Sequence, residues 1–417
     1  MDLNLTKLSS HETPKVQVAT RQVRGGAVMP VLRPYNQARE YVFTSKVVEF
    51  PNTTALVPTA FDNGTIIRYK IERDVTDRIS KPIIVHQLTA DSSSGASFTD
   101  PNMFGKLITL RTAHGTGTSN ILWSCSAYCQ RVLHLILPRD KWDNIQYNSH
   151  KVATPSYTYS NYPTDLTNSA VEEYNCHVLG SPLDIIKPVM FTLSHDLELL
   201  YECSKDIDDT GDNTLTQTHV QMHVDDISGA DKDATIADFK NNIHSFTYLD
   251  TAEILHQQAM VASTQYNIDI GSHLADKLVA GLFVTIRHST SATAVAYRTL
   301  SYDIYRDGVI DVTDGVGKSL IADSNGLTKT QITNNWINHF EAPSNHTNHV
   351  YFIPFTSSFT DSLYKGVRNG GVRLHNSSKL RITAGADFSS ATYEINIQAF
   401  YYKESVQLGG RLTSYDL

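Results

Sequence analysis

The sequence predicts an all-β protein made of two successive β domains with one short helix between them. Charged residues make up only 19% of the 417 residues, and 21 tyrosines accompany abundant threonine, serine and asparagine, a composition that favours strands and polar loops. Runs of alternating or β-branched residues recur at short intervals between turn residues, as in a β-sandwich or barrel. The length favours two domains or one large β domain.

Five segments of the first half are predicted strands, once residues 1–37 are set aside as an arm. They are EYVFTSKVVEF (40–50), TIIRYKIE (65–72), KPIIVHQLTA (81–90), KLITLRTA (106–113) and RVLHLILP (131–138). Long polar loops lie between them, and the one from Asp143 to Asn168 is rich in tyrosine, asparagine and threonine. Loops of this length in a β domain usually carry contacts or surface features.

Five strands are also predicted in the second half, after residue 270. They are KLVAGLFVTIRH (277–288), YRTLSYDIYRDG (297–308), HVYFIPFT (349–356), SKLRITA (378–384) and TYEINIQAFYYK (392–403). The segments IHSFTY and IQAFYY share an I-x-x-F-x-Y pattern, which suggests that each half ends on a similar strand.

The segment between the halves, IHSFTYLDTAEILHQQAM (243–260), changes character part-way. Asp250 and Glu253 have the spacing of a capping box at a helix N-terminus. Four residues then fall at helical spacing on one face: Ala252, Leu255, Ala259 and Ala262. These features predict a helix over residues 251–259.

This segment resembles the double jelly-roll major capsid proteins of large DNA viruses and virophages, in which an aromatic strand runs into a Tyr-Leu-Asp-Thr motif and an acidic residue. Here these are Tyr248, Leu249, Asp250, Thr251 and Glu253. Further similar segments follow in the same order: LVAGLFVTIRH, YDIYRDGVID, VYFIPFTSSF, GVRLHNSSKLRIT and EINIQAFYYKESVQLGGRL. The family's usual run of arginines is missing, and its glycine tail is reduced to two residues, Gly409 and Gly410.

The resemblance implies two consecutive eight-stranded jelly-roll barrels joined by a short helical linker. The expected organisation is an N-terminal arm at 1–37, a first barrel at 38–250, the linker helix at 251–259 and a second barrel with a C-terminal tail at 260–417. In this scheme SFTYLD is the last strand of the first barrel and STQYNIDI the first strand of the second. A helix suits this place because it satisfies its own backbone while crossing between sheets.

The resemblance also implies a structural protein of an icosahedral virion and not an enzyme. Three chains would form a pseudo-hexameric homotrimer, the capsomer. The implied partners are neighbouring capsomers, penton and minor capsid proteins and an internal membrane, with assembly in the host cytoplasm or nucleus. No cofactor is expected.

The formal net charge of −8 argues against a surface that coats nucleic acid, and no direct sequence-specific nucleic-acid binding is expected. A local basic bias occurs only in the arm, which is either a solvated tail or a segment that orders against a neighbouring subunit or an acidic surface. The start of the chain, in the arm and just after it, carries six basic residues against the two acidic residues Asp2 and Glu12. The six are Lys7, Lys15, Arg21, Arg24, Arg33 and Arg39.

No apolar run reaches the roughly 18 residues of a membrane span, and the first residues lack the apolar stretch of a secretory signal. The sequence therefore favours synthesis in a reducing cytosol, where the five Asn-x-Ser/Thr sequons would stay unmodified. The four cysteines show no zinc-binding spacing and are expected to be structural thiols. They are Cys125, Cys129, Cys176 and Cys203.

Two motifs partly resemble metal sites. The segment DIDDTGD (206–212) begins like a calcium loop, but its twelfth position is Gln217 where a bidentate glutamate is needed, which favours a solvated turn. His219 and His223 lie four residues apart, and no carboxylate set accompanies them, which favours ordinary strand histidines. We therefore expect no metal, cofactor or catalytic residues.

Two other functions fit a β-barrel protein and are kept as alternatives. The first is a glycan-binding β-sandwich, such as a receptor-binding protein, and the second is a metal-dependent jelly-roll enzyme that would use His219 and His223 with a carboxylate. Jelly rolls host all three activities, so fold alone does not separate them.

Overall fold

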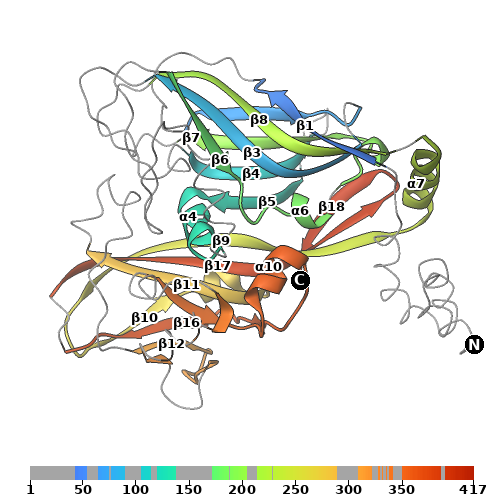
Figure 1. Cartoon of the computed structure of the whole chain (residues 1–417). Coiled ribbons are helices and arrows are strands. Elements are labelled where there is room, and N and C mark those ends of the chain that lie inside the picture. The colour runs from blue at the N-terminus through green and yellow to red at the C-terminus, as the bar shows by residue number, and fades with distance from the viewer. Residues whose placement is uncertain are drawn as a thin grey trace, which may run out of the picture.

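The computed structural model describes most of the chain as two β barrels, one above the other (Figure 1). The described residues are 43–53, 64–74, 77–89, 105–113, 120–137, 171–186, 188–203, 214–227, 229–288, 309–321, 327–328, 331, 335, 338–340, 350–386 and 390–417. The arm at 1–37, the loop Asp143–Asn168 and the DIDDTGD segment lie outside them. None of the described helices is long and apolar enough to cross a membrane.

The first barrel consists of two four-stranded antiparallel sheets. The β8 sheet has the order β1-β8-β3-β6, and the β7 sheet has the order β2-β7-β4-β5. The strands are β1 (Phe43–Pro51), β2 (Ile66–Ile71), β3 (Arg78–Thr89), β4 (Gly105–Ala113), β5 (Ile121–Ser126), β6 (Val171–His177), β7 (Asp196–Cys203) and β8 (Thr214–Ile227). Alternate residues of each sheet point into a shared apolar core, because successive side chains of a strand face opposite sides.

The second barrel repeats this strand order. The β17 sheet contains β9-β17-β11-β14, with β15 and β18 added to β11 and β17, and the β16 sheet has the order β10-β16-β12-β13. The strands are β9 (His244–Met260), β10 (Gln265–Asp269), β11 (Leu278–His288), β12 (Val309–Thr313), β13 (Leu327–Thr328), β14 (Tyr351–Pro354), β15 (Val372–Arg373), β16 (Lys379–Thr383), β17 (Ala391–Leu408) and β18 (Arg411–Asp416). The all-β fold class with two successive barrels is therefore confirmed.

Short helices fill the connections between strands. They are α4 (Ala127–Leu135), α6 (Leu183–Ile186), η3 (Met190–Thr192), α7 (Gly229–Asn241), α8 (Gly271–Leu274) and α10 (Phe359–Lys365). The predicted strand at 131–138 is wrong, because α4 extends to Leu135 and the chain turns at Ile136 and Leu137. Ser126 caps α4 by accepting a hydrogen bond from the Cys129 amide (3.1 Å), and this cap starts a helix directly after β5.

The predicted linker helix at 251–259 is wrong. This span lies inside β9, which pairs with β17 in unbroken register from His244↔Gln407 to Met260↔Ala391. Leu255, one of the residues at helical spacing, is 55% exposed and forms no buried stripe. The backbone hydrogen bonds between β9 and β17 stabilise the strand more than the cap and the helical spacing stabilise a helix. Local helix propensity is weak and is often overridden by tertiary contacts.

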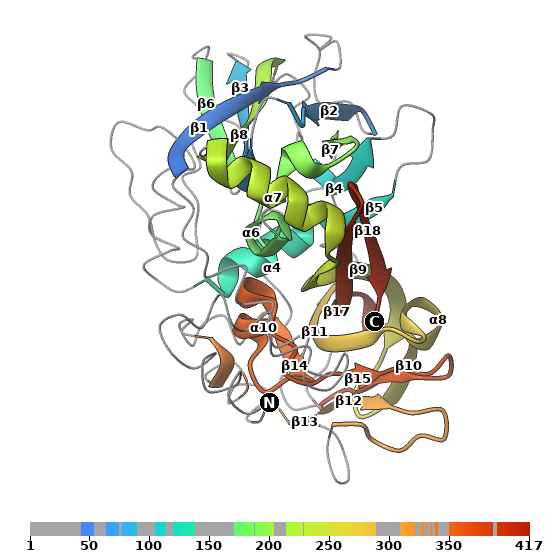
Figure 2. The same ribbon diagram turned by 90° about the vertical axis from the view of Figure 1, so that its right-hand side faces the viewer.

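A helix does connect the barrels, but it comes earlier in the chain. The connector is α7, which follows the last strand of the first barrel and leads into β9 (Figure 2). Lys232 of α7 pairs with Asp77 (2.6 Å), and Phe239 stacks on His244 with 3.9 Å between ring centroids. The segment SFTYLD therefore opens the second barrel, and the division of the chain moves from residue 250 to the α7 connector.

Candidate functional site at the junction of the barrels

The junction begins with the free edge of β5, the last strand of the β7 sheet. Among the described strands β5 pairs only with β4, so the backbone groups on its other edge need different partners. The carbonyl of Leu122 and both the amide and the carbonyl of Ser124 point to that edge. An open edge of this kind is a template for unwanted strand pairing unless something covers it.

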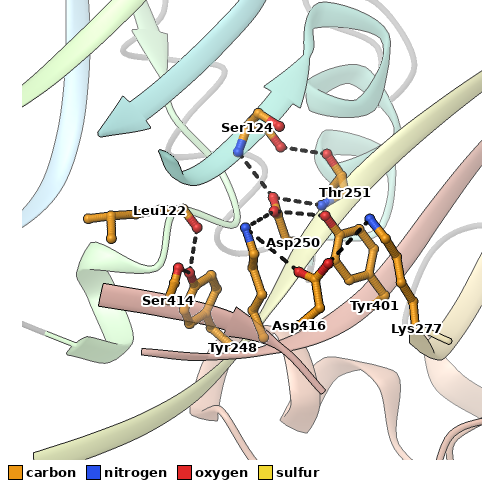
Figure 3. A network of polar contacts seen from close by, with 10 residues as sticks. Leu122, Ser124, Tyr248, Asp250, Thr251, Lys277, Tyr401, Ser414 and Asp416 are labelled. Carbon is orange, nitrogen blue, oxygen red and sulfur yellow. Dashed lines mark hydrogen bonds and ion pairs between the residues drawn. The ribbon is translucent and has the colours of Figure 1, made fainter. Parts of the chain in front are cut away.

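Side chains of β9, from the other barrel, cover this edge (Figure 3). The Asp250 carboxylate accepts a hydrogen bond from the Ser124 amide (3.0 Å), and the Thr251 hydroxyl donates to the Ser124 carbonyl (2.6 Å). The Tyr248 hydroxyl donates to the Leu122 carbonyl. The second barrel thus satisfies, with side chains, backbone groups that the first barrel leaves unpaired.

Asp250 is the centre of this network and is only 2% exposed. Its second oxygen accepts hydrogen bonds from the ammonium group of Lys403 (2.9 Å) and the hydroxyl of Tyr401 (3.0 Å). Its first oxygen also accepts from the Thr251 amide (2.9 Å). Burial of a carboxylate costs free energy unless hydrogen-bond donors and positive charges replace the water molecules that it loses. Asp250 finds these partners in both barrels, so its burial depends on both.

A second carboxylate, Asp416 on β18, lies at the outer side of the network. Lys403 lies 3.9 Å from it and Lys277 3.7 Å, and the Lys277 ammonium sits 3.9 Å from the centre of the Tyr401 ring. Burial, followed by the nearby charge of Asp250, raises the pKa of Tyr401. Burial likewise raises the pKa of Tyr248, so both phenols remain hydrogen-bond donors at neutral pH.

Helix α4 makes another contact between the barrels. The Tyr128 hydroxyl donates to the Thr285 hydroxyl of β11 (2.7 Å), on the outer face of the β17 sheet. On the same face Glu253 accepts hydrogen bonds from the amides of Asn396 (2.7 Å) and Gln398 (2.8 Å). Glu253 therefore ties β9 to β17 beneath the helix that comes from the first barrel.

The hairpin of β17 and β18 forms the third attachment. The Gly410 carbonyl at its turn accepts hydrogen bonds from the amide (2.7 Å) and hydroxyl (3.0 Å) of Ser194, which belongs to the first barrel. The Gln407 amide donates to the Thr192 hydroxyl (2.6 Å). Three separate contacts thus fix the orientation of one barrel against the other.

Comparison with known proteins identifies the architecture. No protein-family model and no curated protein matches the sequence. Among solved structures, the PBCV-1 virus capsid matches with a TM-score of 0.65 at 10% identity, over 91% of this chain and 98% of that one. The Faustovirus major capsid protein (0.58, 10%, 97% and 98%) and the Sputnik virophage structure (0.56, 9%, 91% and 89%) match similarly.

The chain has the double jelly-roll fold of these viral proteins. In the double jelly roll of this chain, the motif residues Tyr248, Asp250 and Thr251 all reach the junction. Asp250 does accept backbone amides, as the capping interpretation required, but they belong to Ser124 and to Thr251 within a strand.

Sequence reasoning missed the partners of this motif in the double jelly roll. Lys403 follows directly on the largely apolar run IQAFYY, and a lysine inside a buried strand signals a buried acidic partner. That signal does not say which of 43 acidic residues is the partner. Ser124 carried no signal, because it contributes through its backbone.

His219 and His223, the pair of histidines considered as metal ligands, do not form one metal site in the double jelly roll. His219 and His223 point to the same side of β8, but four residues of a strand span roughly 13 Å, too far for one ion. His219 lies 3.7 Å from Glu49. Within the described ranges no three His, Cys, Asp or Glu side chains gather in a way that could hold a metal ion, and all four cysteines are buried and outside disulfides.

Replacing Tyr248 with phenylalanine is expected to lower the free energy of unfolding by about 1–2 kcal/mol. The change removes one hydroxyl, which leaves the Leu122 carbonyl without this donor and also breaks the 2.9 Å contact with Ser414. Urea unfolding of the two proteins measures the difference. A Tyr415→Phe variant is the matched control, because Tyr415 is 58% exposed, and it should change stability by less than about 0.5 kcal/mol. Equal effects of the two variants would contradict the role of Tyr248.

Proposed function

We propose that this chain is a capsid protein of an icosahedral virus and that three copies form a pseudo-hexameric capsomer. The observation that supports this function most directly is the match to viral capsid structures over at least 91% of the chain and at least 89% of each matched chain. Because each match extends over both barrels, the similarity includes the way the two barrels are placed against each other as well as the fold of each barrel.

The junction gives this function a physical basis. A shell built from repeated units needs units that keep their shape, and three sets of contacts hold the two barrels at one angle. Three such units arranged around a threefold axis present six barrels, which approximates hexagonal symmetry and allows tiling. The function is therefore geometric and needs no catalytic group.

The proposed location is the virion. The proposed partners are further copies of this chain, neighbouring capsomers, penton and minor capsid proteins and an internal membrane. The matched proteins come from virus particles, which supports the partnership between copies and between capsomers most directly.

Light scattering of the purified protein at micromolar concentration tests this function. We expect three copies of the 46.4 kDa chain, roughly 140 kDa, because permanent interfaces of a capsomer bury thousands of Å². The trimer should persist on dilution and in moderate salt, since screening affects apolar contacts little. A protein that remains monomeric throughout, and binds sugars as a monomer, would contradict the proposal and favour the glycan-binding alternative.

A further inference from the structure

The contact between Lys403 and Asp250 places an amine against a carboxyl group inside the junction. The Lys403 nitrogen lies 2.9 Å from one oxygen of Asp250, and both residues are buried. The carboxyl carbon lies about 1.2 Å from that oxygen, so at most about 4 Å separates the carbon from the nitrogen. This separation is close to the roughly 3–3.5 Å between reacting atoms that are positioned for attack. The two groups are therefore placed for a reaction as well as for an ion pair.

Exposed lysine–aspartate pairs of the same chain lack this setting. Lys379 lies 3.2 Å from Asp269, but the two side chains are 39% and 45% exposed. Water stabilises both charges of such a pair, whereas burial disfavours both charges and favours the uncharged amine and acid. A desolvated lysine amine is a nucleophile that attacks carbonyl carbon atoms. The buried pair of Asp250 and Lys403 is therefore chemically different from a surface ion pair.

The other oxygen of Asp250 lies in an arrangement that activates the carboxyl carbon. It accepts hydrogen bonds from two backbone amides, those of Ser124 (3.0 Å) and Thr251 (2.9 Å) (Figure 3). Amides aimed at one carbonyl oxygen act as an oxyanion hole, which stabilises the negative charge that develops when a nucleophile adds to the carbon. The Ser124 amide belongs to the first barrel, so this activation is complete only when the two barrels are joined.

Two further side chains can assist the proton transfers. The Tyr401 hydroxyl donates a hydrogen bond to the oxygen of Asp250 that faces Lys403 (3.0 Å). Burial raises the pKa of Tyr401, so this donor keeps its proton at neutral pH. Asp416 lies 3.9 Å from the Lys403 nitrogen and is 46% exposed, and a carboxylate in this position can accept a proton from the amine. The site thus contains a nucleophile, an activated carbon, a donor at the leaving oxygen and a base.

We propose that Lys403 and Asp250 condense to an amide, an isopeptide bond that joins β17 to β9 within one chain. One ammonium proton passes to the facing oxygen of Asp250. The neutral amine then attacks the carboxyl carbon, and the electron pair of the C=O bond moves onto the oxygen held by the two amides. Asp416 takes a second proton from the nitrogen and returns it to the facing oxygen, which leaves as water while the C=O bond forms again. The third proton remains as the amide N–H, so one water molecule is lost and no oxidant or cofactor is consumed.

The bond has a consequence for the folded chain. It links residues that are 153 positions apart, and a covalent link over such a distance restricts the unfolded chain strongly. It forms only after the first barrel has supplied the Ser124 amide, so it fixes chains whose barrels are already joined. The reaction occurs once per chain and within one chain. It therefore goes beyond the proposed function and does not depend on it.

Intact mass spectrometry of the purified full-length protein, fresh and after incubation for days, tests the proposal. We expect a growing fraction of chains that are lighter by one water molecule, and a branched peptide that joins Asp250 to Lys403 after proteolysis. Lys403→Arg should keep its full mass, because a guanidinium retains its charge and does not attack the carboxyl carbon. The matched control is Lys379→Arg, which changes the lysine of the exposed pair and should lose water as the wild-type protein does. Circular dichroism checks that each variant is folded.

An Asp416→Asn variant tests the base. Asp416 is 46% exposed, so the variant is expected to fold, and its bond should form at least about tenfold more slowly than in the wild-type protein. The same mass measurement, made at intervals during the incubation, gives both rates. An unchanged rate would overturn the role of Asp416 in the reaction.

The outcomes decide the proposal without reference to assembly. Folded wild-type protein that keeps its full mass throughout would overturn it. A loss of water that persists in Lys403→Arg would also overturn it, because the water would then come from another reaction, such as ring closure at Asp314–Gly315. A branched peptide in the wild-type protein and in Lys379→Arg, absent from Lys403→Arg, supports it. If Lys403→Arg does not fold, the wild-type peptide decides alone, since it contains both joined residues. Failure of the bond to form leaves the capsomer proposal unchanged.

Discussion

Replacing Asp250 with alanine is expected to lower the free energy of unfolding by about 3–5 kcal/mol. The change removes the acceptor for the Ser124 amide, the Tyr401 hydroxyl and the Lys403 ammonium. Among the described residues, the Lys403 side chain, which is 11% exposed, would keep only Asp416 at 3.9 Å as a counter-charge. Urea unfolding monitored by circular dichroism measures the loss. The loss is severe because the whole free energy of unfolding of a protein is typically only about 5–15 kcal/mol.

Two variants make this prediction specific. Asp416→Asn should cost less than about 1 kcal/mol, because Asp416 is 46% exposed and exposed ion pairs contribute little. Combining Asp250→Asn with Lys403→Met should cost less than the sum of the single changes, since the double variant leaves no buried charge alone. Strict additivity of the two substitutions would show that Asp250 and Lys403 do not act together.

Acid is expected to destabilise the first barrel through two histidines that stay neutral in the folded chain, the buried His86 and the partly buried His177. Burial lowers the pKa of His86 to about 3 and that of His177 to about 4. The His86 ring lies in the barrel core, with Nδ1 3.0 Å from the Thr218 hydroxyl, and Thr218 lies 2.6 Å from the Tyr69 hydroxyl. A positive charge on the neighbouring His219 would repel an imidazolium at His86, which lowers the pKa further.

The sign of the effect follows from which state binds protons first. In the unfolded chain a histidine is protonated below about pH 6.5, whereas in the folded chain these two stay neutral to about pH 3 and 4. The stabilisation is therefore complete above pH 6.5 and is lost as the pH falls, by about 1.4 kcal/mol per pH unit for each histidine. Between pH 7 and 4.5 the two together should remove about 5 kcal/mol from the free energy of unfolding.

Unfolding curves at several pH values measure this loss, and a substitution isolates one contributor. His86→Gln can keep a hydrogen bond to Thr218 but cannot titrate, so the slope of its stability against pH should be shallower by about 1.4 kcal/mol per unit. The control His273→Gln changes an exposed imidazole and should leave the slope unchanged. An unchanged slope in His86→Gln would show that His86 is protonated in the folded protein.

The all-β class and the two-part organisation could be predicted from the sequence, because period-two alternation and frequent turn residues are local signals. The position of the helix that connects the barrels could not be predicted. The segment at 251–259 has both a cap-like pair and helical spacing, and only pairing with β17, more than 130 residues away, makes it a strand. The real connector, α7, lacks a clear apolar stripe and is held by single contacts such as Lys232 with Asp77.

Only one side of the junction, the motif around Asp250, could be predicted from the sequence. The motif around Asp250 could be recognised because its residues are adjacent, and its carboxylate does bind backbone amides. Its partners could not be assigned, because Ser124 and Lys403 lie 126 and 153 residues away. A sequence pattern indicates that a buried polar side chain requires a hydrogen-bond or ion-pair partner. Which residue is that partner is determined by the folded chain.

Because β9 follows β5 late in the sequence, its position also affects how the chain folds during synthesis. The edge of β5 stays open on the ribosome until Tyr248, Asp250 and Thr251 have emerged, and Asp250 then waits for Tyr401 and Lys403 near the C-terminus. The first half of a nascent chain therefore exposes an unprotected strand edge while the 126 residues that separate Leu122 from Tyr248 are synthesised, a state prone to aggregation. A cell that makes much of this protein has to shield that half until the last strands arrive, and chains cut short before residue 401 would never bury the edge completely.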